Sequence, residues 1–243
     1  MLQGSKWETT AQINRKQGNA LPIRTLYNRH FGQTGILVAS GQSLDKCLRK
    51  LKFVSSPILA VNRAYPALEI MGIEPTYVFN VDALSKPIDN KKEVPLICAR
   101  KSSPEFRDKW NGQIFEFDDI VGNDPWSVQY RKDNPNLDYL PGGGNVSTLM
   151  LNIALSVLGM KRIVFVGHDF WTPYNDEYDF QNESYRQFLQ WTVQLIGLAL
   201  QSGVEFVVED VDLWMRNCPP ELRWIIHHTR PMKLEDSIAC FRL

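Results

Sequence analysis

The chain has 243 residues, 44% of them hydrophobic, which suits one large α/β domain or one domain with an appendage. Lysine plus arginine and aspartate plus glutamate both number 27, so no global field attracts nucleic acid or an anionic membrane. No stretch approaches the roughly 20 apolar residues that span a bilayer, and the polar start lacks a signal-peptide core, so a cytoplasmic protein is expected.

The patterning divides the chain into three parts. Residues 1–33 are polar and weakly patterned, and we expect them to form an arm or a first helix. Residues 34–210 alternate short apolar runs with helical segments, which predicts a Rossmann-like domain. Residues 211–243 predict a packed C-terminal tail, although their basic side chains are also suited to a phosphate.

The first informative stretch is residues 35–45, GILVASGQSLD. Its apolar run predicts a buried parallel strand, and a leucine-spaced helix begins at Leu44. Between them, Gly41 lets a ligand come close to the backbone, while Ser40 and Ser43 add hydroxyls and Ser43 is placed to cap the helix. Amides at a helix N-terminus favour a phosphate. The alternative is a simple βα turn, since the stretch matches neither GxGxxG nor a P-loop.

Two further βα units follow. Runs 57–61 and 76–81 predict strands, and 64–71 predicts the helix between them. Three units in succession imply an α/β fold with a doubly wound, mostly parallel sheet and helices on both faces. Asn62 and Asp82 fall just past the strands, at the carboxyl edge where such sheets bind ligands. Asn62 suits a phosphate, ribose or base edge, and Asp82 suits a ribose hydroxyl or Mg²⁺; alternatively, both residues satisfy their own turns.

The middle of the chain predicts two short strands, at 94–99 and 113–117. Segment 118–140 is rich in Asp, Asn, Pro and aromatics, which predicts a long loop or small subdomain, a lid over the site. Its aromatic side chains either stack on a base or pack the loop down.

The second informative stretch is a triple glycine at 142–144 that feeds directly into an apolar helix. Glycines leave several backbone amides accessible to an anion at the start of that helix. A flexible linker is the alternative. The pattern favours an anion-binding loop that contains Gly143, Gly144, Asn145 and Ser147.

The next predicted strand, 162–166, ends in Gly-His-Asp-Phe-Trp. Such a group at the carboxyl end of a strand indicates a site more than a turn. His168 is interpreted as a proton carrier, a ligand contact or a structural histidine, and Asp169 as a residue that orients a ligand hydroxyl or caps the loop. Neither HxH nor HExxH occurs here, so a dedicated zinc site is not expected.

The last third predicts an amphipathic helix at 182–202 and a final strand at 204–208. The core face of this helix is expected to carry Phe188, Trp191, Leu195 and Leu198. Scattered cysteines without CxxC spacing predict buried or free thiols rather than disulfides: Cys47, Cys98, Cys218 and Cys240.

Three segments together resemble a known family. GILVASGQSLDKCLRKL and ILAVNRAYPALEIMGIEPTYVFNVDA are similar to the family that joins archaeal-type 6-hydroxymethylpterin pyrophosphokinases with bacterial motility accessory factors, which glycosylate flagellin. GGGNVSTLMLNIALSVLGMKRIVFVGHDFW is similar to that family's later motif and to a pattern of bacterial sialyltransferases. Gln42 stands where the family usually has proline. The likeness covers residues 34–85 and 139–172.

The resemblance implies a role for each matching position. It places Asn62 by a phosphate or ribose, Asp82 in the nucleotide or metal region, and Asp169 at the strand end that closes the site. The two phosphate-facing turns would contain Gly41, Gln42 and Ser43 in the first, and Gly143, Gly144, Asn145 and Ser147 in the second. The sialyltransferase-like enzymes use a histidine downstream of this motif. Here none follows His168 until His227, so that base is unassigned.

Three functions remain open. The first is a glycosyltransferase that uses a nucleotide-activated sugar, such as a CMP-nonulosonic acid, with a small-molecule or glycan acceptor and His168 or a tail histidine as base. The second is Mg²⁺-dependent transfer of diphosphate from ATP to a 6-hydroxymethylpterin, with Asp82 as metal ligand. The third is a nucleotide-binding module without catalysis. Compact length favours the second, while the glycine loop and HDFW favour the first, which we prefer. No tightly bound cofactor is expected, and the sequence is compatible with a homo-oligomer.

Overall fold

The computed structural model describes residues 14, 20–119, 123, 125–141, 145–169, 182–208 and 211–231. Its strands are β1 (Leu21–Pro22), β2 (Thr34–Val38), β3 (Ile58–Val61), β4 (Tyr77–Asn80), β5 (Leu96–Ala99), β6 (Ile114–Phe117), β7 (Arg162–Val166), β8 (Glu205–Val208) and β9 (Arg230–Pro231). Its α-helices are α2 (Leu44–Leu51), α3 (Tyr65–Ile70), α4 (Pro104–Asp108), α5 (Pro125–Asp133), α6 (Val146–Ser156), α7 (Asn182–Leu200), α8 (Val211–Asn217) and α9 (Arg223–His227). Two 3₁₀ turns are η1 (Ile23–Leu26) and η2 (Pro220–Leu222).

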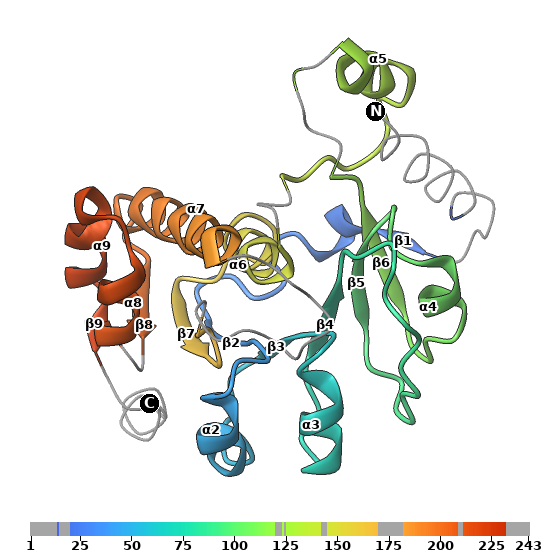
Figure 1. Cartoon of the computed structure of the whole chain (residues 1–243). Coiled ribbons are helices and arrows are strands. Elements are labelled where there is room, and N and C mark those ends of the chain that lie inside the picture. The colour runs from blue at the N-terminus through green and yellow to red at the C-terminus, as the bar shows by residue number, and fades with distance from the viewer. Residues whose placement is uncertain are drawn as a thin grey trace.

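In the described part of the chain, nine strands form one sheet in the order β1-β6-β5-β4-β3-β2-β7-β8-β9, and every pairing is parallel. Parallel strands need both faces covered, which explains why β3, β4 and β5 are buried at every residue. The predicted parallel α/β fold is confirmed. Figure 1 shows α2 and α3 below the middle of the sheet and α6 and α7 above it.

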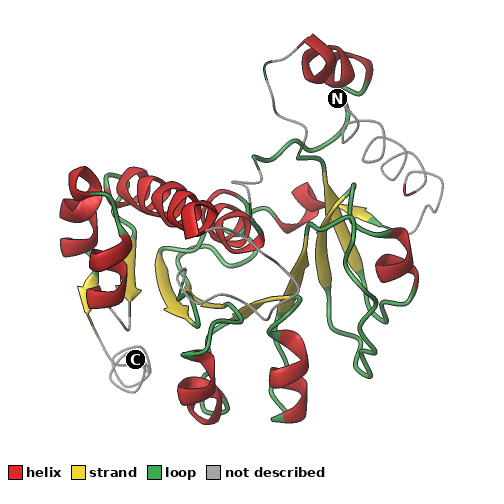
Figure 2. Cartoon of the chain, in the orientation of Figure 1, coloured by secondary structure: helices red, strands yellow, loops and turns green. Residues whose placement is uncertain are grey.

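Two hydrophobic clusters hold the layers together. The larger one joins β2, β3, β7 and β8 with α6 and α7, and α6 lies across β2, β3 and β4 (Figure 2). The smaller one packs α3 and α4 on the opposite face, with Tyr65, Phe106 and Trp110 against Val78, Leu96 and Cys98. The sheet is therefore covered on both faces at β4, where the two clusters meet.

The segments expected to flank the domain also contribute strands. Leu21 and Pro22 pair with Phe115 and Glu116 at one edge, and Arg230 and Pro231 pair with β8 at the other. The sequence predicted that the strand at 204–208 would be the last one, but β9 follows it. Both edge strands have only two residues, too short for the period of two to be visible in a sequence.

The core face of α7 agrees only in part with the predicted one, since Leu195 packs against the core but Leu198 does not. Leu198 is 65% exposed, whereas Leu189, Val193 and Ile196 are completely buried. The prediction followed the aromatic residues along the helix, but α6 contacts the neighbouring stripe, where Thr192 bonds to Thr148 of α6. Polar Thr192 hid this stripe from a purely hydrophobic pattern.

Segment 118–140 contains a helix, α5, and starts and ends at the same place. The backbone of Asp118 bonds to Asp138 and to Leu140, and Tyr130 donates a 2.8 Å hydrogen bond to the Asp118 carboxylate. The excursion is therefore closed at its base, and in Figure 1 α5 stands away from the sheet. Its role as a lid remains a prediction.

Candidate functional site

The order of the strands creates a switch point between β2 and β7. From β2 the chain adds β3, β4, β5 and β6 on one side and then returns to place β7 on the other. In such sheets the crevice outside the carboxyl ends at the switch point is where ligands bind. The turn after β2, with Gly41 and Ser43, and the turn after β7, with His168 and Asp169, meet at this point.

Asp169 joins the two turns. Its buried carboxylate accepts hydrogen bonds from the Ser43 amide, at 2.9 Å, and from the Ser43 hydroxyl. The predicted cap is therefore wrong in one detail, because the Ser43 side chain makes no capping bond to α2. It donates to Asp169 instead, and the carboxylate of Asp169 takes up an amide at the helix N-terminus, where negative charge is favourable. In this geometry Asp169 holds the β2 turn in place.

Gly41 lies in the narrowest part of this junction. Its amide donates to the Gly167 carbonyl at 2.9 Å, and a Cβ atom on it would lie 2.5 Å from both that carbonyl and an oxygen of Asp169. Gly167 in turn has φ +70° and faces the Ala39 carbonyl. Two glycines therefore allow the turns to touch. Phosphate binding by this turn remains a prediction, with Gln42 exposed and Ser40 half-buried beside Gly41.

His168 is buried beneath the junction, with 6% of its surface exposed. Its Nδ1 lies 3.1 Å from the Val166 carbonyl, which can only accept, so Nδ1 carries the proton. The ring packs edge-on against Phe165, and the indole of Trp214 donates to the His168 carbonyl. Burial lowers the pKa of His168 to about 4, although the bond to Val166 opposes this shift. The imidazole is therefore neutral at pH 7.

Asn62 and Asp82 lie at the carboxyl edge, one and two strands away from the switch point. The Asn62 amide donates to Asn80 of β4 and to Ser85. Asp82 is exposed and accepts a 2.8 Å bond from the Leu84 amide, as a turn residue does. The structure thus brings Asn62 close to the Asp82 turn through Asn80, a contact that residue spacing does not indicate.

Asn145 caps α6, at the exit of the glycine-rich stretch. Its side-chain oxygen accepts from the Thr148 amide at 3.0 Å, and its amide donates to the Thr148 hydroxyl. That hydroxyl bonds to Thr192, which donates to the Phe188 carbonyl, so the cap is tied to α7. Ser147 is half-buried in the first turn of α6. Gly143 and Gly144 lie outside the described residues.

A buried ionic cluster lies at the ends of β5 and β6, also unforeseen from the sequence. Glu116 accepts from Arg100 at 2.5 Å and from Arg107 at 2.9 Å, and Arg100 also lies 3.8 Å from Asp118. The spacing of these residues in the sequence does not predict the cluster, because they meet only through strand register and helix α4. Since each charge has an opposite partner, the cluster anchors the base of the 118–140 excursion rather than offering a reactive group.

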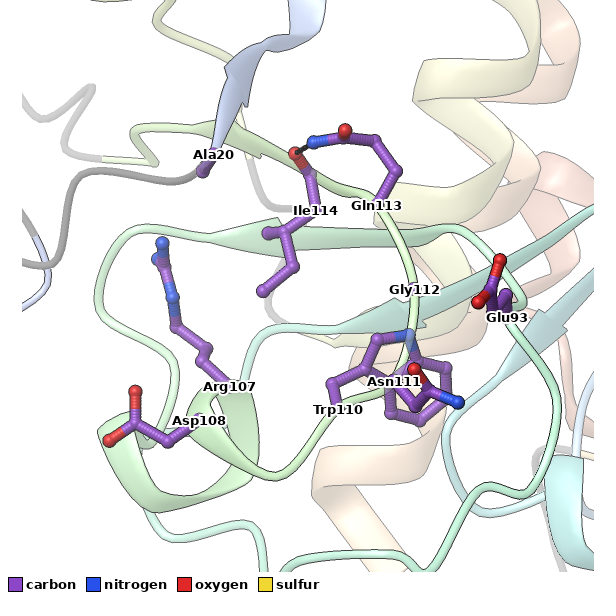
Figure 3. A pocket seen from close by; sticks show the side chains of 9 residues that line it. All are labelled: Ala20, Glu93, Arg107, Asp108, Trp110, Asn111, Gly112, Gln113 and Ile114. Atoms are coloured by element: carbon purple, nitrogen blue, oxygen red, sulfur yellow. Dashed lines mark hydrogen bonds between the residues drawn. The ribbon is translucent and has the colours of Figure 1, made fainter.

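A cavity of about 610 Å³ lies at the other end of the sheet. Figure 3 shows its wall, formed by the end of α4, the segment 110–114 that leads into β6, Glu93 before β5 and Ala20 before β1. It contains none of the predicted site residues. The candidate site therefore remains at the carboxyl edge of the sheet.

Neither a metal cluster nor a membrane helix is present in the described part. Among those residues no three His, Cys, Asp or Glu side chains come together, and no helix there is long and apolar enough to cross a membrane. The thiols of Cys47, Cys98 and Cys218 are buried and form no disulfide among the residues described, as expected, while Cys240 lies outside them.

The all-parallel sheet and its switch point define a doubly wound α/β protein. Comparison with models of protein families identifies the protein's class more closely than the fold does. The family model described as 6-hydroxymethylpterin diphosphokinase MptE-like matches residues 10–175, and the chain belongs to this family.

Comparison with solved structures bears on the fold alone. The MAf glycosyltransferase from Magnetospirillum magneticum AMB-1 superposes with a TM-score of 0.57 at 14% sequence identity. The match covers 78% of this chain but 33% of the glycosyltransferase, so the chain spans about a third of that protein's length. No curated protein sequence matches the chain.

Proposed function

We propose that this protein transfers diphosphate from ATP to the hydroxymethyl group of a 6-hydroxymethylpterin. The observation that carries the proposal is the rigid β2 turn at the switch point, where Asp169 holds Ser43 and two glycines bring the turns together. A turn fixed before the ligand arrives is suited to phosphates, because positioning is most of what phosphoryl transfer requires. Membership of the MptE-like family supports the same chemistry.

The proposed step needs no strong side-chain base. The pterin hydroxyl oxygen attacks the β-phosphorus of ATP, and the bond from that phosphorus to the oxygen bridging to the α-phosphate breaks. AMP leaves with that oxygen, the β- and γ-phosphates stay on the pterin, and the hydroxyl proton passes to solvent. This agrees with a buried, neutral His168 and with an Asp169 whose carboxylate is bonded to Ser43. The sequence-based assignment of both residues as catalytic is retained only as a positioning role in this proposal.

Mg²⁺ would neutralise the developing charge on the phosphates. Asp82 is the residue suited to hold it, since its carboxylate is exposed at the carboxyl edge and only one of its oxygens is bonded to the Leu84 amide. Mg²⁺ commonly takes one or two carboxylates and completes its shell with water and substrate phosphates.

Glycosyl transfer from a CMP-sugar is the second candidate. The observation in its favour is the fold that the chain has in common with the MAf glycosyltransferase. It requires a base for the acceptor hydroxyl, and a base with a pKa of about 4 at His168 is poorly matched to that task. A nucleotide-binding module without catalysis is the third.

The test incubates the protein with Mg²⁺, ATP and 6-hydroxymethyl-7,8-dihydropterin and follows ³¹P NMR. We expect AMP and pterin diphosphate to form together and EDTA to stop the reaction. A parallel reaction contains CMP-sialic acid and a glycan acceptor. Release of CMP there without AMP in the first reaction would replace the proposal with sugar transfer. The Asp45→Ala variant, changed at an exposed position of α2, is expected to match the wild type.

A further inference from the structure

Helices α6 and α7 cover one face of the sheet and carry almost no charge. The sequence contains no Asp, Glu, Lys or Arg from 139 to 160, which includes all of α6, or from 187 to 204, which includes most of α7. In the whole chain 22% of the residues are charged. The outward side of a surface helix is normally charged or polar, so these two helices are unusual for an outer layer (Figure 1).

Helix α7 has a second apolar stripe besides the buried one. The residues of this outer stripe follow one another at spacings of three, four and three, as in the seam of a coiled coil: Phe188, Trp191, Leu195 and Leu198. The first three are partly buried and Leu198 is 65% exposed, whereas Val193 of the buried stripe is completely buried. A helix that is apolar on two sides is expected to be covered on both.

The outer stripe lies on the side of α7 that borders α6. Thr148 of α6 bonds to Thr192 of α7, and both helices run in the same direction because each precedes one of two parallel strands. Seven residues make about two helical turns, so Leu155 and Ala199 return to the side and height at which the two threonines meet. The outer surfaces of the two helices therefore adjoin. We call them together the α6–α7 face, which consists of Asn152, Leu155 and Ser156 of α6 and Trp191, Leu195 and Leu198 of α7.

The composition of the α6–α7 face indicates what covers it. Helices that lie on a membrane carry Lys or Arg on their polar side, and nucleic acid also requires basic groups, but neither residue occurs on this face. The cores of protein interfaces, by contrast, are depleted of charged residues. In a two-fold dimer a patch meets itself, so a charge near the axis would meet a like charge. A face without charges avoids this repulsion, and the net charge of zero adds none between two copies.

We propose that the α6–α7 face binds the same face of a second copy of this chain, so that four helices pack between two sheets. With 11 and 19 residues, the helices are about 16 and 28 Å long and about 11 Å wide, which gives roughly 500 Å² on each copy. The total of about 1,000 Å² is at the lower limit of specific interfaces, so we expect a dissociation constant on the order of 10 µM. The inference does not depend on the proposed reaction.

Sedimentation velocity at about 1 to 200 µM protein tests the proposal, because the wild type should pass from monomer to dimer over this range. Leu198→Glu places a carboxylate in the apolar contact, and we expect it to raise the dissociation constant roughly thirtyfold or more. Ile70→Glu is the matched control. It makes the same kind of change at an 85% exposed residue of α3, on the opposite side of the sheet in Figure 1, and should dimerise as the wild type does.

A wild type that stays monomeric at the highest concentration would overturn the proposal. A dimer that survives Leu198→Glu, or that Ile70→Glu also breaks, would overturn it too, because the contact would then lie elsewhere.

A second variant covers the case in which Leu198→Glu folds poorly. Ser156→Lys adds a charge to the exposed end of α6, where a cation suits the helix C-terminus, so the fold should be kept. We expect it to weaken the dimer roughly fivefold or more, and a dimer as stable as the wild type would contradict the proposal. Flotation with phosphatidylcholine vesicles tests a lipid surface. A monomeric wild type that floats with them, while Leu198→Glu does not, would assign the face to a membrane instead.

Discussion

The two halves of the carboxyl edge differ in which parts of the chain their polar groups join. At the switch point, the Asp169 carboxylate accepts from both the amide and the hydroxyl of Ser43, and the Gly41 amide bonds to Gly167. At the ends of β3 and β4, Asn80 keeps a buried donor without a partner. The first half joins two turns that are far apart in the chain. The second joins residues that follow the neighbouring strands β3 and β4, through the Asn80 oxygen.

This difference bears on the stability of the switch point. A turn that hydrogen bonds already hold in place needs no binding energy to order it when a ligand arrives. Changes at the switch point should therefore lower the stability of the protein.

The largest effect is expected from breaking the scaffold at Asp169. Asp169→Ala leaves the partly buried amide and hydroxyl of Ser43 without their acceptor, and should cost about 2 kcal/mol of unfolding free energy. Urea denaturation measures it. Asp45→Ala, on the exposed first turn of α2, is the matched control and should change stability by less than about 0.5 kcal/mol. Similar losses in both variants would mean that Asp169 does not hold the turn.

The pH dependence of stability provides a second test of the switch point, because His168 is buried there. Folding lowers its pKa from 6.5 to about 4, so between these values the unfolded chain binds more protons than the folded one. Stability should therefore fall as the pH drops from 6.5 towards 4, by at most about 1.4 kcal/mol per pH unit from this residue. Urea denaturation of wild type and His168→Gln across this range measures the difference in slope. Equal slopes in the wild type and the His168→Gln variant would reject the assignment.

The smallest effect is expected at the α6 cap. Asn145→Ala removes the acceptor of the Thr148 amide and should cost about 1 kcal/mol, seen as a lower urea midpoint. Asn152→Ala changes the same residue type within α6, where the side chain makes an exposed bond to Pro141, and should be nearly neutral. A cap loss no larger than this control would show that the α6 terminus is held by its packing on α7 instead.

Sequence periodicity was sufficient for the main elements. The strand at 162–166 has the predicted bounds, and the buried strands at the centre of the sheet lie within two residues of theirs. Each is a continuous apolar run that ends at a turn residue, which is the pattern of a strand buried on both faces. The same runs placed Gly41, Asn62, Asp82 and Asp169 at one edge of the sheet, because parallel strands share their carboxyl ends.

Tertiary structure alone decided which of these residues touch. Nothing in the spacing shows that Asp169 bonds to Ser43 across 126 positions, that Asn80 lies beside Asn62, or that Arg100 and Arg107 converge on Glu116. Such contacts depend on strand order and register, and a parallel sheet pairs segments that are distant in the chain. The sequence by itself determined the elements and the edge at which they end, since both follow from local hydrophobic period and turn residues. Pairing between neighbouring strands decided which polar groups meet at that edge.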